Sequence, residues 1–222
     1  LTSTGGVIGD SGEGLANEES QADPSTMTLY EKSKARLEAE LPRFLDRGLE
    51  VVTVNPARVF GPGAIGDSNG EVMVMQRYLS GKFRFLPGDG HATASYCYLD
   101  DVVEGHLLAL QKGRPGERYI LGGDNASYLQ FFDTIGELAG RKYRMYPVPL
   151  GALQAFAQLQ VWYAQNFNGY PLITPELVRK YGRNWSFSSD KAVRELGYRY
   201  RNLEESVGLT LDWLMEKETG RA

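Results

Sequence analysis

The strongest constraint on the fold is a predicted helix that is followed at once by a short apolar strand. From Met27 to Leu45, apolar side chains recur at the spacing of one helix face, with charged residues between them. Gly48 ends this pattern, and residues 49–55, which are rich in valine, predict a strand that closes at Pro56. A helix followed by a buried strand is typical of a parallel sheet, so we expect an α/β fold.

The predicted helix carries two chemically capable side chains, Tyr30 and Lys34, which are four residues apart. Positions four apart share one face of a helix, so the phenol and the ammonium should project in the same direction. A neighbouring ammonium favours the phenolate form of a tyrosine, which makes Tyr30 a candidate general acid or base. Such pairs also occur by chance on solvated helices, so the interpretation depends on the segments around them.

The flanking segments give the pair an ordered context. Upstream, residues 1–4 (Leu-Thr-Ser-Thr) are typical of a strand end that runs into a glycine turn, and residues 5–26 predict a loop. Downstream, the strand at 49–55 leads through Asn55-Pro56 into residues 57–63 (Ala-Arg-Val-Phe-Gly-Pro-Gly). The order is therefore a strand with hydroxyl groups, a helix with Tyr and Lys, and a strand that ends in Asn-Pro.

The rest of the chain predicts a mixed and mainly helical second half. We expect strands at 83–87 and 95–99 around the turn Gly88-Asp89-Gly90, and a strand at 118–121. Asp100 or Asp101 is the expected N-terminal cap of an amphipathic helix over 101–112. Further helices are predicted at about 71–79, 128–139, 149–166, 174–181, 189–195 and 203–217.

The ordered motifs resemble those of the extended short-chain dehydrogenase/reductase family, the NAD-dependent epimerase/dehydratase family, in its dihydroflavonol-reductase-like branch. The resemblance covers essentially the whole chain and includes residues 98–106 (Tyr-Leu-Asp-Asp-Val-Val-Glu-Gly-His) and 189–198. It implies the C-terminal part of a Rossmann-type parallel sheet plus a small, mainly helical substrate lobe. Residues 1–60 and about 95–125 would form the remainder of the NAD(P)-binding domain, and about 61–94 and 126–222 the substrate-binding lobe.

The resemblance also implies a role for each motif residue. Thr4, with Ser3 as the runner-up, would hydrogen-bond the substrate oxygen, and Tyr30 would exchange a proton with that oxygen. Lys34 would hold the cofactor ribose. The nicotinamide of NAD or NADP would be lined by Pro56, Ala57 and Val59. We therefore expect an oxidoreductase that transfers hydride to or from a small carbonyl or alcohol substrate.

Three departures from the family pattern narrow this expectation. The family's glycine-rich pyrophosphate turn would lie upstream of Thr4, so the sequence is expected to match roughly the C-terminal two-thirds of such an enzyme. Sugar dehydratases carry an Asp-Glu pair where this chain has Gly5 and Gly6, which argues against dehydration. Nucleotide-sugar enzymes commonly place a phosphate-binding arginine where this chain has Ala94, which favours a substrate without a nucleotide.

Two alternatives stay open. Residues 59–63 (Val-Phe-Gly-Pro-Gly) are close to the pattern of epimerases, so a sugar epimerase of the same family is the second hypothesis. The third is a truncated, non-catalytic binding protein that keeps the fold without the chemistry.

Composition limits the partners and the cellular location. The net charge is −4 and no basic block stands out, which argues against nucleic acid. The single cysteine, Cys97, cannot form an internal disulfide, so a cytoplasmic protein is expected. The apolar stretch 150–164 is interrupted by glutamines and predicts a buried or partner-facing helix rather than a membrane contact. A homodimer that forms through long helices, including 27–47, is implied by the resemblance.

The remaining polar clusters have simpler interpretations. Two histidines, His91 and His106, and one cysteine lack metal-ligand spacing, so no metal is expected. We interpret His106 as a packing or surface residue of its helix. The basic-aromatic cluster at 179–183 is interpreted as a solvated surface.

Overall fold

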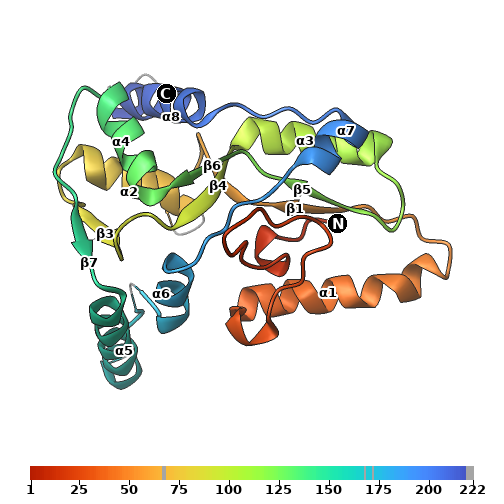
Figure 1. The fold of residues 1–222 in the computed structure, drawn as a ribbon, viewed down its shortest axis with the longest axis horizontal. Helices are drawn as coiled ribbons and strands as arrows, with labels where there is room; N and C mark the ends of the chain where they lie inside the picture. The colour runs from red at the N-terminus through yellow and green to blue at the C-terminus, as the bar shows by residue number, and fades with distance from the viewer. Residues whose placement is uncertain (67–68, 168, 172, 219–222) are drawn as a thin grey trace.

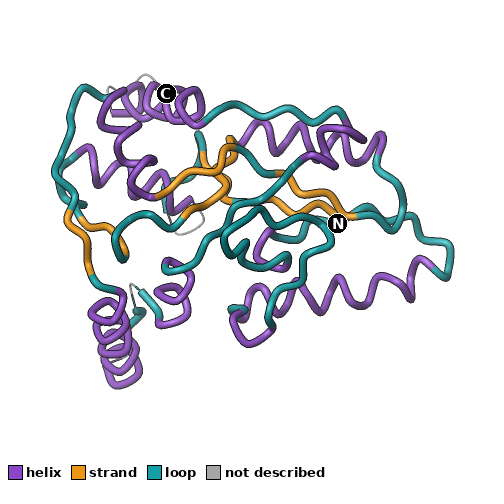
Figure 2. The backbone as a smooth tube through the Cα atoms, viewed as in Figure 1, coloured by secondary structure: helices purple, strands orange, loops and turns teal. Residues whose placement is uncertain are grey.

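The computed structural model describes residues 1–66, 69–167, 169–171 and 173–218, and it confirms an α/β fold with parallel strand pairs (Figures 1 and 2). The strands are β1 (Thr53–Pro56), β2 (Arg58–Phe60), β3 (Phe85–Pro87), β4 (Thr93–Tyr98), β5 (Arg118–Leu121), β6 (Asp124–Ser127) and β7 (Tyr146–Val148). The helices are α1 (Leu29–Leu45), α2 (Gly70–Leu79), α3 (Leu99–Lys112), α4 (Tyr128–Leu138), α5 (Leu150–Phe167), α6 (Pro175–Tyr181), α7 (Asp190–Leu196) and α8 (Leu203–Glu218).

The sheet that supports the candidate site is the parallel pair β1 and β5. Its register places Thr53 opposite Arg118 and Pro56 opposite Leu121. The N-terminal segment extends this sheet, because Ser3 N donates to Val54 O at 2.8 Å and Thr2 bridges Val54 in the parallel sense. Helix α1 lies on one side of the strands and α3 and α7 lie on the other (Figure 1). The expected parallel layer with helices around it is therefore present.

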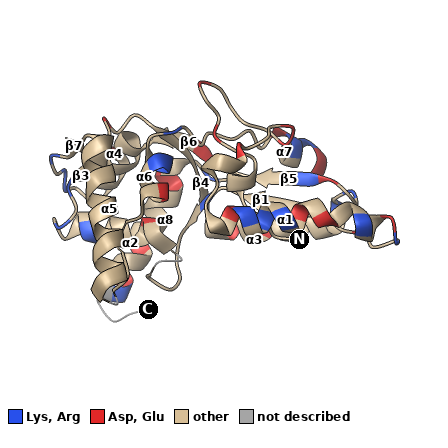
Figure 3. Cartoon of the chain, turned by 90° about the horizontal axis from the view of Figure 1, so that it is seen from below, with Lys and Arg blue, Asp and Glu red and all other residues tan. Residues whose placement is uncertain are grey.

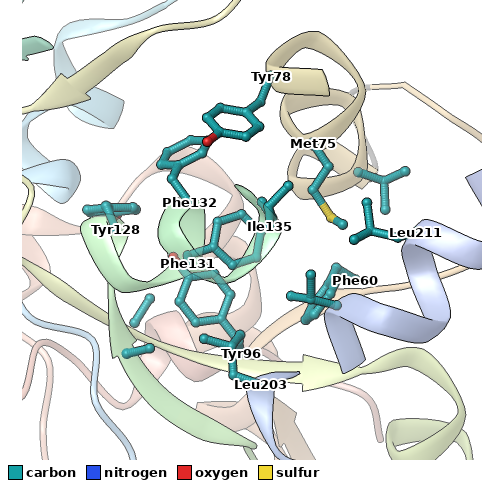
Figure 4. Packing of buried hydrophobic residues seen from close by; sticks show 14 of the residues in the cluster. Phe60, Met75, Tyr78, Tyr96, Tyr128, Phe131, Phe132, Ile135, Leu203 and Leu211 are labelled. Carbon is teal, nitrogen blue, oxygen red and sulfur yellow. The ribbon is translucent and has the colours of Figure 1, made fainter. Parts of the chain in front are cut away.

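A second sheet carries the larger hydrophobic core. Strand β4 pairs with β2 in parallel and with β6 in antiparallel fashion, and β3 pairs with β7 in a separate parallel ribbon. Side chains from β2, β4, α2, α4 and α8 fill the core between these elements (Figure 4). Its large members include Phe60, Met75, Tyr78, Tyr96, Tyr128, Phe131, Phe132, Ile135 and Leu211.

Aromatic rings hold β2 in place within this core. Phe131 stacks on Tyr96 with ring centroids 4.5 Å apart, and Phe60 meets Phe131 edge-on at 5.9 Å. Buried aromatic pairs in these geometries add to the free energy gained from burial alone. Because β2 follows directly on β1, the same packing fixes where the chain leaves the end of β1.

The predicted helices are confirmed with ends that differ by at most two residues. The strands are less well predicted. Residues 49–52 are not part of a strand, because the partner strand β5 begins at Arg118, opposite Thr53. Strands β2, β6 and β7 were not expected, since each spans only three or four residues and shows no alternation of apolar and polar side chains.

The expected helix cap at Asp100 or Asp101 is wrong. Helix α3 begins at Leu99, with Tyr98 in the capping position and no side-chain cap hydrogen bond. The Asp101 carboxylate is buried and instead accepts a hydrogen bond from Arg201 N at 2.8 Å, in addition to an ion pair with the Arg201 guanidinium. Asp101 therefore binds a residue that is distant in sequence, Arg201, instead of capping its own helix.

Replacing Ile135 by alanine tests the packing of the larger hydrophobic core, which lies against the second sheet. Ile135 has no exposed surface, whereas Leu138 on the same helix is 42% exposed. Ile135→Ala should lower the free energy of unfolding by about 2–5 kcal/mol, because it removes buried methyl groups and leaves a cavity. The matched change Leu138→Ala should cost less than half as much. Urea unfolding followed by circular dichroism measures both, and equal losses would contradict this packing.

Candidate functional site

Lys34 links the Tyr-Lys helix directly to the hydroxyl-bearing strand end. Its Nζ donates a hydrogen bond to the carbonyl of Thr2 at 3.0 Å. Thr2 lies on the edge of the β1–β5 sheet, two residues before Thr4. The structure therefore brings together the two motifs that the sequence placed about 30 positions apart.

Thr4 and Ser3 differ in accessibility. Thr4 is half-buried at the start of a short 3-10 helix, and its Oγ1 accepts a hydrogen bond from Gly6 N at 3.3 Å. Ser3 is only 3% exposed, and its Oγ has no hydrogen-bond partner among the described residues. Of the two candidate hydroxyls, Thr4 is the one that a bound molecule can reach.

Tyr30 lies in the first turn of α1, with a ring that is 57% exposed. A reciprocal cap fixes this turn: Glu31 N donates to Thr28 Oγ1 at 3.3 Å, and Thr28 N donates to Glu31 Oε2 at 2.8 Å. Lys34 Nζ lies 5.7 Å from the centroid of the Tyr30 ring. The phenol thus stands on a well-anchored helix start, with the ammonium beside it and solvent in front of it.

A buried amide that sequence reasoning treated only as a strand end supports this arrangement. Asn55 has no exposed surface, and its Nδ2 donates to Thr4 O at 3.1 Å and to Glu38 Oε1 at 3.0 Å. Glu38 in turn pairs with Arg118 of β5 at 3.1 Å. Glu38 follows Lys34 by one helical turn, and that spacing is the signal that could have identified it. The network ties α1 to both strands and to the Thr4 turn.

A second unexpected contact links the first turn of α1 to α6. The Glu31 carboxylate is only 3% exposed and forms an ion pair with Lys180 Nζ. It also lies against Gly6, where an added Cβ would be 2.0 Å from Glu31 Oε1. The interpretation of residues 179–183 as a solvated surface is therefore wrong for Lys180. It is wrong for Tyr181 as well, because this side chain packs against the larger hydrophobic core and meets the ring of Tyr128 edge-on at 5.8 Å. Burial raises the pKa of its phenol to about 12.

The residues expected to line the nicotinamide lie at the end of β1 and in β2. Pro56 is the last residue of β1, and Ala57 N donates to Leu121 O at 3.1 Å. Val59 lines an open cavity of about 200 Å³ together with residues 60–64, Asn69 and Leu99. The end of β1 lies beside the Thr4 turn, since a Cβ added at Gly5 would be 3.3 Å from the Pro56 carbonyl oxygen, whereas Val59 belongs to the second sheet.

Arg58, between Ala57 and Val59, anchors a polar cluster that sequence reasoning missed. Its guanidinium pairs with Glu71 at 3.0 Å and donates to the Tyr128 hydroxyl at 3.1 Å. The rings of Tyr128 and Tyr96 lie 5.3 and 5.8 Å from its central carbon. The cluster joins β2 to α2 and α4, so it fixes the far side of the segment that follows β1.

His106 is more closely placed to the site than expected. Its Nε2 lies 3.1 Å from Thr2 Oγ1, and its Nδ1 lies 2.7 Å from Val102 O. This contact supports the edge strand from the side of α3. Among the residues that the structure describes, no group of three or more His, Cys, Asp or Glu side chains could hold a metal ion.

Known proteins share both the sequence pattern and the fold. The family model described as NAD dependent epimerase/dehydratase family matches residues 1–122. The chain is 27% identical over 219 residues to a putative dihydroflavonol 4-reductase from Synechocystis sp., which covers 96% of this chain and 62% of that protein.

Two solved structures extend the comparison. The crystal structure of gox2253 matches with a TM-score of 0.77 and 31% identity, covering 99% of this chain and 66% of that one. The Thermus thermophilus UDP-glucose 4-epimerase, solved as a complex with NAD, matches with a TM-score of 0.71 and 25% identity, covering 97% of this chain and 63% of that one. The chain thus spans a little under two thirds of the length of these relatives.

Substitution of Gly6 tests the contact between the Thr4 turn and α1. Gly6→Ala would place a methyl group within 2.0 Å of the Glu31 carboxylate, which is held by Lys180 and Thr28. The free energy of unfolding should fall by about 1–3 kcal/mol, as expected for overpacking. Gly14→Ala is the control, because its nearest neighbour would be 4.0 Å away, and it should change stability by less than about 0.5 kcal/mol. Denaturant titration compares the two, and an unaffected Gly6→Ala protein would rule out this packing.

Proposed function

The chain belongs to the NAD-dependent epimerase/dehydratase family, the extended short-chain dehydrogenases/reductases, and from this premise we propose that it takes part in reversible hydride transfer between NAD(P) and a carbonyl or alcohol substrate. The observation that carries the proposal is the hydrogen bond from Lys34 to the Thr2 carbonyl. It holds Lys34, one helical turn after Tyr30, against the segment that carries Thr4, where a phenol, an ammonium and a hydroxyl would act together. Those are the groups that proton exchange with a substrate oxygen requires.

Lys34 has the donors needed to hold a ribose. An ammonium carries three N–H groups, and the described residues use one of them, at Thr2 O. The other two are free to bind vicinal hydroxyls. The end of β1 and the start of β2, at Pro56, Ala57 and Val59, would line the nicotinamide ring. When bound there, the nicotinamide supplies or accepts the hydride.

Tyr30 would exchange the proton with the substrate oxygen, and Thr4 would hydrogen-bond that oxygen. In the reducing direction the carbonyl carbon gains the hydride, and the carbonyl oxygen takes the proton of the Tyr30 hydroxyl. In the oxidising direction Tyr30 accepts the proton that the alcohol loses. Thr4 Oγ1 would donate a hydrogen bond to the same oxygen and so stabilise the charge that develops on it. The half-buried position of Thr4 supports it over the buried Ser3 for this task.

The surroundings of the site favour a substrate without a nucleotide diphosphate. Ala94 is 1% exposed within β4, where it pairs with Ala126, so no side chain at this position offers a charge to a phosphate. The space beside Gly6 is filled by the Glu31 carboxylate, which is committed to Lys180 and Thr28. A reductase or dehydrogenase fits these contacts better than a dehydratase. The putative dihydroflavonol 4-reductase among the relatives agrees with this choice.

The division of labour along the chain is part of the proposal. Residues 1–60 and about 95–125 would bind the cofactor, and about 61–94 and 126–222 would bind the substrate. The separate hydrophobic clusters around β1 and β5 and around α2, α4 and α8 support such a division. Two elements depart from it: β4 contributes to the second of these clusters, and α7, within 126–222, packs against β5 and α3 on the cofactor side.

Sugar epimerisation is the second candidate function. The segment 59–63 that favours it lines the cavity of about 200 Å³ at the end of β2. The epimerase from Thermus thermophilus shares the fold at 25% identity. Tight binding of a nucleotide sugar, measured by calorimetry, would favour this alternative over the reductase.

Replacing Tyr30 by phenylalanine tests the proposed proton transfer. The change removes only the hydroxyl of a half-exposed ring, so it should lower kcat by about 10²–10⁴-fold, the usual contribution of a positioned general acid or base. Affinity for the cofactor should be largely unchanged. The rate is followed by NAD(P)H absorbance with a panel of ketones and alcohols, using the full gene product.

Tyr146→Phe serves as the matched control, because Tyr146 is also exposed, at 45%, and lies in β7, away from the Thr4 turn. It should leave kcat within about twofold of the unmodified protein. Undiminished turnover in the Tyr30→Phe protein, with nicotinamide fluorescence showing normal cofactor binding, would refute the assigned role.

A further inference from the structure

Helix α5 exposes a large apolar surface that the proposed catalytic function does not use. Figure 1 shows that the helix projects from the body of the molecule beside α6. Five of its large side chains are between 47% and 61% exposed, and we call them the α5 apolar face: Phe156, Leu159, Trp162, Tyr163 and Phe167. Soluble proteins seldom leave a continuous apolar patch of this kind uncovered.

The exposed side chains form one continuous strip. Positions 156, 159, 163 and 167 recur at three- and four-residue spacing, so they share one face, with Trp162 along its edge. Ala157 is the only buried residue of the helix, and the helix packs against α6. The strip is therefore left over after the internal packing of the helix is complete.

The stretch of sequence that contains α5 carries charges of a single sign. No Asp or Glu occurs between Glu137 and Glu176, although the whole chain contains 28 of them. The same interval contains Arg141, Lys142 and Arg144, all exposed, just before β7 leads into the helix. The helix itself has no charged residue at all. An apolar strip thus lies next to a basic segment within an otherwise acidic protein.

The β3–β7 ribbon continues this surface. Phe85 and Tyr146 occupy paired positions in the ribbon and are 55% and 45% exposed. Arg84, next to Phe85, lies over the ring of Tyr143 at 4.4 Å, which brings a further cation to the basic segment. Figure 3 shows Lys and Arg positions in the segments next to β3 and β7. Exposed aromatic side chains of the ribbon therefore lie close in sequence to basic residues.

We propose that α5 and the β3–β7 ribbon dock on the surface of a lipid bilayer that contains anionic lipids. Tryptophan, tyrosine and phenylalanine favour the boundary between headgroups and acyl chains, and nearby Lys and Arg are attracted to anionic headgroups. No helix in the described part of the chain has the length and apolar character to cross a bilayer, so the segment would lie in the interface. This differs from the sequence-based expectation of no membrane partner.

A second copy of the chain fits the same surface less well. In a two-fold symmetric dimer the same patch of each copy meets itself. Arg141 and Arg144 of the two copies would then approach one another, and residues 138–175 contain no carboxylate that could pair with them, whereas Lys142 already pairs with Glu137 at 2.6 Å. An anionic bilayer supplies the complementary charge that a second copy lacks.

Vesicle co-sedimentation of the full gene product tests the proposal. The protein should sediment with vesicles of phosphatidylglycerol and phosphatidylcholine, and far less with phosphatidylcholine alone. The double variant Leu159→Glu, Trp162→Glu should reduce the partition coefficient at least about tenfold, because it places charge in the apolar strip. The triple variant Arg141→Gln, Lys142→Gln, Arg144→Gln should reduce it roughly 100-fold on the anionic vesicles, at about fivefold for each cation.

The control is Leu110→Glu, since Leu110 is 83% exposed on α3, and it should sediment like the unmodified protein. Thermal unfolding confirms that every variant is folded. Equal sedimentation of the double variant, or no preference for anionic vesicles, would overturn the proposal. So would a lipid-free dimer, seen by analytical ultracentrifugation, that the double variant abolishes.

Discussion

The hydrogen bond from Lys34 to the Thr2 carbonyl is the contact on which the rest of the candidate site depends. It joins the exposed side of α1 to an edge segment that is otherwise paired with β1 at a single bridge. Asn55 adds a second tie from beneath, because its amide donates both to Thr4 O and to Glu38. One helix is therefore attached to the sheet at two successive turns. The position of Tyr30 relative to Thr4 follows from these attachments rather than from the sequence spacing of the two residues.

The sequence could predict those parts of this arrangement that depend only on residues close together along the chain. The apolar spacing of α1 and the four-residue interval between Tyr30 and Lys34 are properties of one helix, and both can be seen in the sequence alone. The pair Glu31 and Lys180 is separated by 149 positions, and no periodicity encodes such a contact. The short strands β2, β6 and β7 could not be predicted from the sequence for the same reason. Their residues become strand only because a partner lies alongside.

Buried ion pairs connect the candidate site to the helical part of the molecule. Glu31 links the first turn of α1 to Lys180 of α6, and Arg58 links β2 to Glu71 of α2. Such pairs add little net stability, yet breaking one partner is costly, so they define geometry more than they strengthen the fold. Helix α6 also packs against α5, the proposed membrane-docking element. A chain of contacts thus connects α5 through α6 to Glu31, the residue next to Tyr30.

A crystal structure of the full gene product with NAD(P) and a bound alcohol or ketone would test the roles of Tyr30, Lys34 and Thr4 directly. The Tyr30 hydroxyl should lie within about 2.6–3.2 Å of the substrate oxygen. Lys34 should contact the ribose, and Thr4 should face the same substrate oxygen. A nicotinamide bound away from residues 56–59, or a Tyr30 hydroxyl turned away from the substrate, would contradict these roles.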